Sequence, residues 1–196
     1  MRTPWGYDVS GDLSPIITLA DFNAMTGKAY TAGSRGEAAL KAASQAIRNY
    51  CGWHVCPSMT CTANPTGGQA VTRLPAGYVS SVSGITEDGE TLASADYVWR
   101  KDGLLKRAAP YRWSDEWGAI EVEYVAGYAE NAVPDLAEAV CSIAEGVLSV
   151  SAGVMSESAD GVSISYNSNS ASIASALTSA QKSALEPYRL VSSHAA

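Results

Sequence analysis

The strongest constraint on this 196-residue chain is a change in the spacing of its apolar residues. They recur every three or four positions up to about residue 54, alternate with polar residues to about residue 130, and then return to the first spacing. The first spacing is typical of helices and the second of strands. The sequence therefore predicts an α+β fold: a small helical bundle with an inserted antiparallel β-sheet or barrel section, followed by a C-terminal arm and helix.

These changes in pattern divide the chain into six segments. The arm is rich in Ser, Asn and Gly, a composition that favours an extended or mobile segment over a packed core, and only GVSISY (161–166) alternates like a strand. The expected segments are an N-terminal segment (1–17), a helical part (18–54), an antiparallel β section (55–130), a third bundle helix (131–153), the Ser-rich arm (154–177), and a C-terminal helix and tail (178–196).

Capping residues mark four helices. Side chains that cap an N-terminus, or a proline in the first turn, precede each apolar stripe, and a glycine or proline follows it. The expected starts are Thr18 with Asp21, Ser34 with Glu37, Pro134 and Thr178 with Gln181, and the expected stops are Gly27, Gly52, Gly153 and Pro187. In the second helix, an apolar stripe is flanked by many alanines, which let another helix approach closely.

The β section contains six strand candidates, which are residues 58–63, 69–75, 78–89, 95–103, 104–109 and 119–128. The pairs Asp88-Gly89 and Asp102-Gly103 predict hairpin turns, because both residue types tolerate a positive φ. In the last candidate, Glu121 and Glu123 alternate with apolar residues. This pattern predicts an antiparallel strand with one buried face.

The charge balance argues against a protein that grips DNA. The chain has 13 Lys and Arg against 20 Asp and Glu, a formal net charge of −7. Sequence-independent DNA binding requires clustered Lys and Arg that neutralise phosphates. The nearest approach to a cluster is Arg100, Lys101, Lys106 and Arg107, which flank a predicted turn and are interpreted as a solvated surface. Such a chain can still line a passage through which DNA slides.

The residues that could support catalysis or metal binding do not form a recognisable site. Cys51, Cys56 and Cys61 recur every five residues, which is not a zinc-ligand spacing, and together with Cys141 they are interpreted as buried thiols. His54 lies among them without an evident orienting group. No phosphate loop, signal segment or membrane-spanning stretch is evident. We therefore expect no catalytic, cofactor-binding or metal-binding residues, and a soluble protein made in the cytoplasm.

The order of the elements carries the most information about function. The helix EAALKAASQAIRNYCGW (37–53) precedes a section that begins RLPAGYVSSVSG (73–84), then IEVEYVAGY (120–128), VPDLAEAVCSIA (133–144) and a final SALEPYR (183–189). This series resembles the head–tail connector, or adaptor, proteins of long-tailed bacteriophages across residues 37–190. The chain departs from shorter members of that family by carrying the whole β section.

The resemblance implies a structural virion subunit of the phage neck, made in the host cytoplasm. It implies a homo-oligomeric ring of twelve copies that joins the portal protein to the tail-side stopper, lets DNA pass through its lumen, and needs no cofactor or membrane. As portal contacts we expect Tyr188, Arg189 and Leu190, unless this segment packs on its own domain. As contacts between subunits we expect Trp113, Trp117, Ile164 and Tyr166, although the two tryptophans could equally cap the end of the sheet.

Three other interpretations stay open at this point. The chain could be a stopper or tail-completion ring protein of the same virion. It could be a carbohydrate-binding module of a tail protein that uses Trp99, Trp113 and Trp117, although this leaves the capped helices unexplained. It could also be a thiol enzyme that uses Cys51 or Cys56 with His54.

Overall fold

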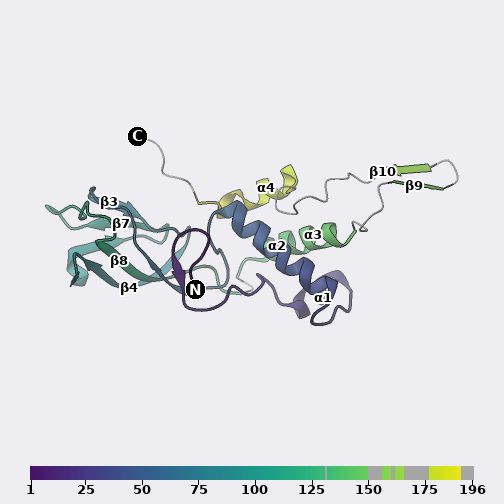
Figure 1. The fold of residues 1–196 in the computed structure, drawn as a ribbon, viewed down its shortest axis with the longest axis horizontal. Coiled ribbons are helices and arrows are strands. Elements are labelled where there is room, and N and C mark those ends of the chain that lie inside the picture. Colours follow the sequence, from purple (N-terminus) through teal and green to yellow (C-terminus); the bar gives the residue numbers. More distant parts are fainter. Residues whose placement is uncertain (131, 150–155, 160–161, 166–176, 191–196) are drawn as a thin grey trace. The chain divides into compact units, whose positions relative to one another are not determined.

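The structure is a computed structural model that describes residues 1–130, 132–149, 156–159, 162–165 and 177–190 (Figure 1). The described residues form four α-helices and antiparallel sheets, which confirms the predicted α+β class. The chain divides into two compact units. The strand unit comprises Met1–Ser14, Cys51–Ala132 and the chain from Tyr188 onward, and the helical unit comprises Pro15–Tyr50 and Val133–Pro187.

The helices begin and end close to the predicted residues. They are α1 (Leu19–Thr26), α2 (Arg35–Cys51), α3 (Pro134–Ser149) and α4 (Ser179–Leu185). The Thr18 side chain caps α1, and Gly27 ends it with a φ of 65°. Thr178 and Gln181 form the capping box of α4, and Pro187 lies in the short 3-10 turn Glu186–Tyr188 that follows. Gly153, the expected stop of the third helix, lies outside the described residues.

Ser34 and Glu37 both form hydrogen bonds with the backbone at the start of α2. The Ser34 hydroxyl accepts a hydrogen bond from the Glu37 backbone N–H at 3.4 Å, as the sequence predicts. The Glu37 carboxylate accepts from the Gly33 backbone N–H and pairs with Lys41 one turn later. The hydrogen bond from Lys41, with that from Gly33, lowers the pKa of Glu37. Side chains therefore accept hydrogen bonds from two backbone N–H groups at the N-terminus of α2, those of Gly33 and Glu37.

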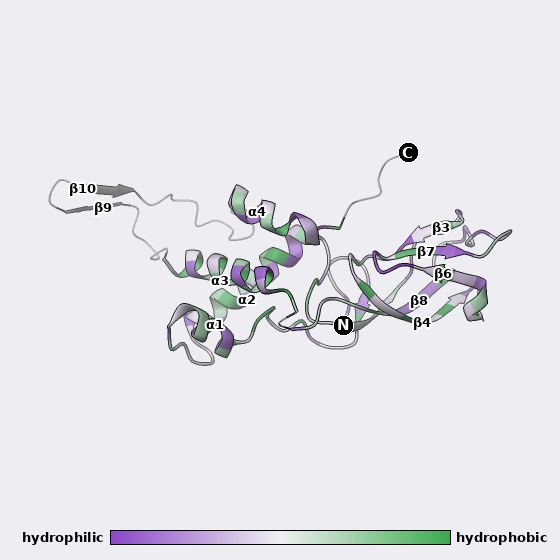
Figure 2. Ribbon diagram, turned by 180° about the vertical axis from the view of Figure 1, so that it is seen from behind, coloured by the Kyte–Doolittle hydropathy of each residue, from purple (hydrophilic) through white to green (hydrophobic). Residues whose placement is uncertain are grey.

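The core of the helical unit is built from the predicted apolar stripes. Leu40, Ala43 and Ile47 of α2 are fully buried, and Leu136, Val140 and Ile143 supply the buried face of α3. Figure 2 shows apolar and polar residues alternating around these two helices. The buried Ser44 hydroxyl donates to the Leu40 carbonyl and accepts from the Ile16 N–H, so this polar group is satisfied inside the core.

The strand unit holds all six predicted strands in two open sheets rather than a closed barrel. A five-stranded sheet has the order β1-β2-β8-β4-β5, and a three-stranded sheet has the order β3-β7-β6. The bounds are β1 Asp8–Val9, β2 Met59–Ala63, β3 Val71–Arg73, β4 Val79–Glu87, β5 Glu90–Thr91, β6 Tyr97–Trp99, β7 Leu104–Arg107 and β8 Ile120–Ala126. Figure 1 draws β3 and β7 in one layer and β4 and β8 in the other.

The turns and the central strand follow the sequence pattern. Asp88 and Gly89, with φ of 51° and 84°, connect β4 to β5, and Gly103, with φ of 80°, lies between β6 and β7. Along β8, Ile120, Val122, Tyr124 and Ala126 are buried, whereas Glu121 and Glu123 are exposed. The two glutamates therefore mark the outer face of the five-stranded sheet, as predicted.

A buried histidine joins three distant segments of the strand unit. The His54 Nε2 lies 3.0 Å from the Ala126 carbonyl oxygen, which only accepts, so Nε2 carries the proton and Nδ1 accepts from the Tyr7 hydroxyl at 2.8 Å. The same hydroxyl accepts from the His54 backbone N–H at 3.0 Å. These bonds tie the N-terminal segment and the end of β8 to the turn that follows α2.

Part of the Ser-rich arm pairs as a hairpin. Strands β9 (Ser156–Ala159) and β10 (Val162–Ser165) are antiparallel, with Val162 opposite Ala159. The strand predicted in GVSISY is therefore confirmed at residues 162–165. Its partner β9 was not predicted, since SESA lacks apolar alternation.

We predict that Gly127→Ala destabilises the protein more than Gly89→Ala. Both glycines have a positive φ, 99° and 84°, so both substitutions add backbone strain of about 1 kcal/mol. Only at Gly127 would the new Cβ also collide with the Pro57 carbonyl oxygen and with His54 Nε2, whereas Gly89 faces open space. We expect losses of about 3 and about 1 kcal/mol in urea unfolding. Equal losses would mean that the turn after β8 is not held as described.

Candidate interaction surfaces

An ion pair in the interior of the strand unit links its two sheets. Arg107 of β7 donates from Nε to a Glu87 carboxylate oxygen of β4 at 2.9 Å, and the two side chains are only 12% and 10% exposed. Arg107 Nη1 also donates to the Asp96 carbonyl at 2.8 Å, and the second Glu87 oxygen accepts from the Ser114 N–H at 2.8 Å. Because each charge has several partners, the pair is well satisfied despite its burial.

Trp113 completes this interior cluster. Its ring lies 5.7 Å from the Arg107 guanidinium, its backbone bonds to Gln69 and Gly68, and its side chain is 2% exposed. Of the two interpretations of Trp113, this geometry favours a side chain that caps the end of the sheets. The buried indole is not positioned to touch a neighbouring molecule directly.

Trp117, four residues later, has the opposite environment. Its side chain is fully exposed, and Tyr111 in the same connection between β7 and β8 is 61% exposed. The connection is anchored at its centre by Trp113 and by the bond from Ser114 to Glu87. A large aromatic side chain on an anchored loop is typical of a residue that anchors a partner protein.

The segment Tyr188–Leu190 packs on the strand unit. The Tyr188 carbonyl accepts from the Trp53 indole N–H at 2.7 Å, and the Tyr188 ring meets Tyr128 edge to face at 5.6 Å. The Leu190 N–H donates to the Cys51 carbonyl at 2.8 Å. Tyr188 and Leu190, two of the three expected portal contacts, therefore pack on their own domain, and Arg189, between them, is exposed.

The other two expected contacts lie in the arm. Ile164 is in β10, where only the backbone is described. Tyr166 lies outside the described residues.

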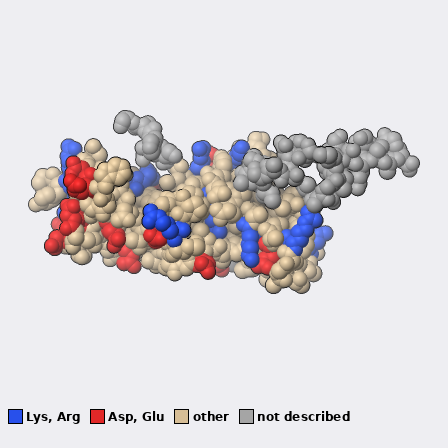
Figure 3. Space-filling view, viewed as in Figure 1, with Lys and Arg blue, Asp and Glu red and all other residues tan. Residues whose placement is uncertain are grey.

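The fold turns one of the four basic residues that approach a cluster in the sequence, Arg107, away from the surface. Arg107 points into the interior pair, whereas Lys106 beside it is exposed, since successive residues of a strand face opposite sides. Arg100 pairs with Asp102 at 3.0 Å in the exposed turn. On the face that Figure 3 shows, basic and acidic side chains are interspersed.

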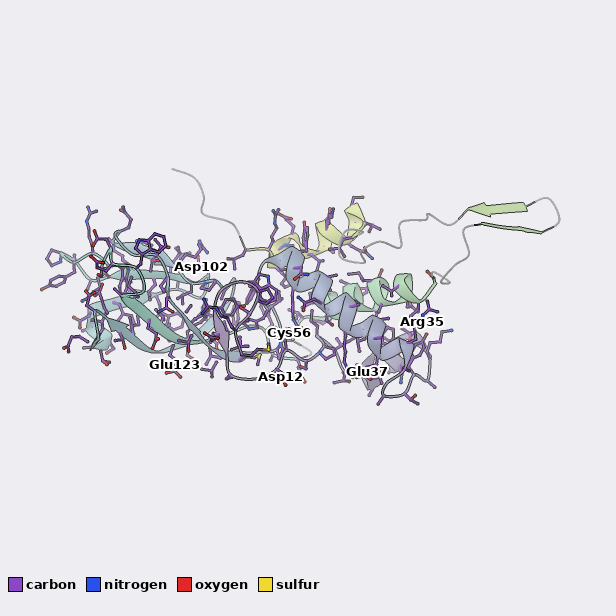
Figure 4. All side chains as sticks on the ribbon, in the orientation of Figure 1. Asp12, Arg35, Glu37, Cys56, Asp102 and Glu123 are labelled. Atoms are coloured by element: carbon purple, nitrogen blue, oxygen red, sulfur yellow. The ribbon has the colours of Figure 1, made fainter. Side chains whose placement is uncertain are left out.

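The cysteines and His54 have structural environments. All four thiols are buried, and burial raises the pKa of Cys61 to about 12, which opposes thiolate formation at neutral pH. Burial, reinforced by Glu145 and Glu138, also raises the pKa of Cys141. Cys56, which Figure 4 labels, is buried, and the two ring nitrogens of His54 are hydrogen-bonded to Tyr7 and Ala126. This geometry favours packing roles over activation of a thiol.

The described part of the chain has neither a metal-binding cluster nor a helix that could span a membrane. No three His, Cys, Asp or Glu side chains there are grouped so that they could hold a metal ion. None of the helices in the same ranges has the length and apolar character needed to cross a bilayer.

We predict that Arg107→Met destabilises the protein strongly, whereas Arg100→Ala does not. Removing Arg107 leaves the Glu87 charge buried and unpaired, which we expect to cost about 3 to 5 kcal/mol in the free energy of unfolding. The Arg100–Asp102 pair is 72% and 42% exposed, so breaking it should cost at most about 1 kcal/mol. Chemical denaturation of both variants tests this. A small loss for Arg107→Met would show that the pair does not join the sheets.

Chains in solved structures of particle necks have a similar fold. A chain from the neck of a native gene transfer agent (GTA) particle, computed with C12 symmetry, aligns with a TM-score of 0.61 and 14% identity, covering 94% of this chain and 95% of that chain. A chain from the neck of the empty particle, computed with C6 symmetry, gives 0.60 and 17% over the same coverage. A third, from the virion of the native particle, gives 0.57 and 18%. At these identities the likeness establishes a shared fold.

Sequence comparison identifies the family. A search of curated proteins finds no significant match. The family described as head completion protein matches residues 15–191, which include all four helices and every strand except β1. Since this match extends over most of its length, the chain belongs to the head completion protein family.

Proposed function

We propose that this protein is a structural subunit of the head–tail neck of a bacteriophage-like particle. The observation that carries the proposal is the family match over residues 15–191, together with a fold shared along 94% of the chain with proteins from the neck of a GTA particle. Within the neck, we assign it to the adaptor ring between the portal and the tail-side stopper. It is made in the host cytoplasm and ends in the virion.

The proposed assembly is a ring of twelve identical copies. The C12 symmetry used for the neck of the related particle supports this number. A closed ring encloses a lumen, and a subunit with a net charge of −7 suits a lumen through which DNA must move without adhering. The buried thiols and the engaged His54 agree with a subunit that works through contacts rather than catalysis. No cofactor or membrane is part of the proposal.

Portal docking is assigned to the exposed side chain of the C-terminal segment. Tyr188 and Leu190 hold the segment on the strand unit through Trp53, Tyr128 and Cys51, and this leaves Arg189 exposed between two fixed neighbours. A guanidinium on a fixed backbone can form a two-pronged pair with a partner carboxylate. Tyr188 and Leu190 therefore act mainly by positioning Arg189.

Contacts between subunits are assigned to Trp117 and to the arm. Trp117 presents its whole side chain at the surface, and Trp113 supports the loop that carries it. In the arm, Ile164 of β10 and the nearby Tyr166 are the proposed contacts with a neighbour, because a hairpin can extend onto a second copy by strand addition.

The main alternative is a stopper or tail-completion ring protein. The family description, head completion protein, is compatible with either ring. A carbohydrate-binding module is less well supported, since its surface would need Trp113, which is buried.

We predict that Trp117→Ala weakens ring assembly without changing the stability of the monomer. The fully exposed side chain contributes no burial to the isolated fold, so its free energy of unfolding should change by less than about 0.5 kcal/mol. The buried Trp113 is the matched control, and Trp113→Ala should cost about 3 to 5 kcal/mol. Native mass spectrometry and denaturant unfolding measure both effects. Undiminished ring formation by Trp117→Ala would remove this residue from the interface.

We predict that Arg189→Glu reduces portal binding at least tenfold while the mass of the ring is unchanged. Reversing one exposed charge leaves the backbone bonds of Tyr188 and Leu190 in place. The substitution is a cleaner test than a truncation before α4, because the truncation would also remove Leu185 from the core. Arg35→Glu, an exposed reversal in the helical unit, is the control. Pull-down of the protein with a purified portal is the measurement. Portal binding that is equal in both variants would contradict the assignment.

A further inference from the structure

The outer face of the three-stranded sheet combines aliphatic and basic side chains in two rows. The register places Lys106 of β7 between Val71 of β3 and Val98 of β6, and the two valines are 46% and 61% exposed. In the next row Leu104 lies opposite Arg73, and its carbonyl accepts from the Arg100 N–H. The face therefore presents both apolar and charged groups, the two kinds of group that a protein interface combines.

An acidic residue beside this face, Asp102, neutralises part of its charge. Asp102 in the β6–β7 turn pairs with the Arg100 side chain at 3.0 Å, and its backbone carbonyl accepts from Arg73 Nη1 at 2.9 Å. Within the described part of the chain, Lys106 has no carboxylate within ion-pair distance. The face therefore keeps a positive charge between its two valines.

The outer face of the five-stranded sheet has the complementary chemistry. Asp8 of β1, Thr62 of β2 and Glu123 of β8 form one row, and Glu121 lies opposite Thr86 of β4. The three carboxylates are exposed, and in the described ranges none of them has a Lys or Arg partner. The other outward residues of these strands are mostly Ser and Thr, and none is Lys or Arg.

The two faces belong to one compact unit and point away from a shared interior. On the inner sides of the two sheets, Arg107 and Glu87 form an ion pair at 2.9 Å. The charged residues on the two outer faces do not take part in this pair. Figure 4 labels Asp102 by the upper layer of the strands and Glu123 by the lower layer. A closed ring made by head-to-tail contacts requires two different, mutually complementary surfaces on each copy.

We propose that the basic, valine-bearing face of β3-β7-β6 in one copy docks on the acidic, hydroxyl-rich face of β1-β2-β8-β4-β5 in the next copy of the ring. This inference rests on the proposed ring function and names the surfaces that build it. Lys106 lies at the centre of the first face, and Glu121 and Glu123 at the centre of the second. The partner is a second copy because each face carries the charge that the other lacks.

Charge reversal tests the contact. The basic-face variant is Arg73→Glu with Lys106→Glu, and the acidic-face variant is Glu121→Lys with Glu123→Lys. Either variant alone presents two faces of like charge, and we expect its ring formation on portal to fall at least tenfold. An equimolar mixture of the two variants, and the chain that carries all four substitutions, restore complementary faces and should form rings again. Lys28→Glu, an exposed reversal in the helical unit, is the control.

The readouts separate failure of the contact from failure of the function. Native mass spectrometry and electron microscopy report rings, and thermal melting verifies that each variant folds. Loss in both variants with rescue in the mixture supports the proposal. Normal rings from each variant alone would overturn the proposed contact but not the proposed ring function. If such rings no longer bound the portal or the stopper, the reversed face would be assigned to the partner that was lost. A wild-type chain that forms no ring on portal would overturn both.

Discussion

The structure of the strand unit depends on one buried ion pair, between Arg107 of β7 and Glu87 of β4. It is a side-chain connection between the two sheets, and hydrogen bonds from Arg107 to the Asp96 carbonyl and from Ser114 to Glu87 bring two loops into the same cluster. A buried pair of this kind adds little net stability compared with apolar packing, but removing either partner is costly. The pair lies on the same inward side as the buried apolar residues, such as Leu105 and Ile85, and by strand alternation their neighbours face outward.

Local signals in the sequence were sufficient for most of the fold. Helix limits follow from side chains within four residues of each end, such as Thr18 with Asp21 and Thr178 with Gln181, and the strands follow from alternation within each segment. Two kinds of feature could not be obtained in this way. The two-residue strands β1 and β5 are too short to show a period, and the bond between Tyr7 and His54 joins residues that are 47 positions apart.

The candidate contacts show where sequence reasoning reaches its limit. Trp113 and Trp117 are the same residue type in the same polar connection, yet Trp113 is 2% exposed and Trp117 is 100% exposed. The difference arises because Arg107 points inward and packs on Trp113, and the sequence does not say which of Lys106 and Arg107 faces inward. The family resemblance was more secure, since it depended on the order of capped helices and strands rather than on the direction of any single side chain.

The contrast between buried and exposed charges also bears on how a ring of this kind would assemble. Each exposed pair across the proposed contact is worth at most about 1 kcal/mol, so two free copies would associate weakly and the subunit would stay dispersed before it meets its site. The contact that closes a ring forms between two ends of one assembly, so it costs no further translational entropy of a free subunit. A portal that holds the copies side by side raises their effective concentration in the same way. Weak, complementary outer faces around a strongly held interior would thus confine assembly to the place where a template exists.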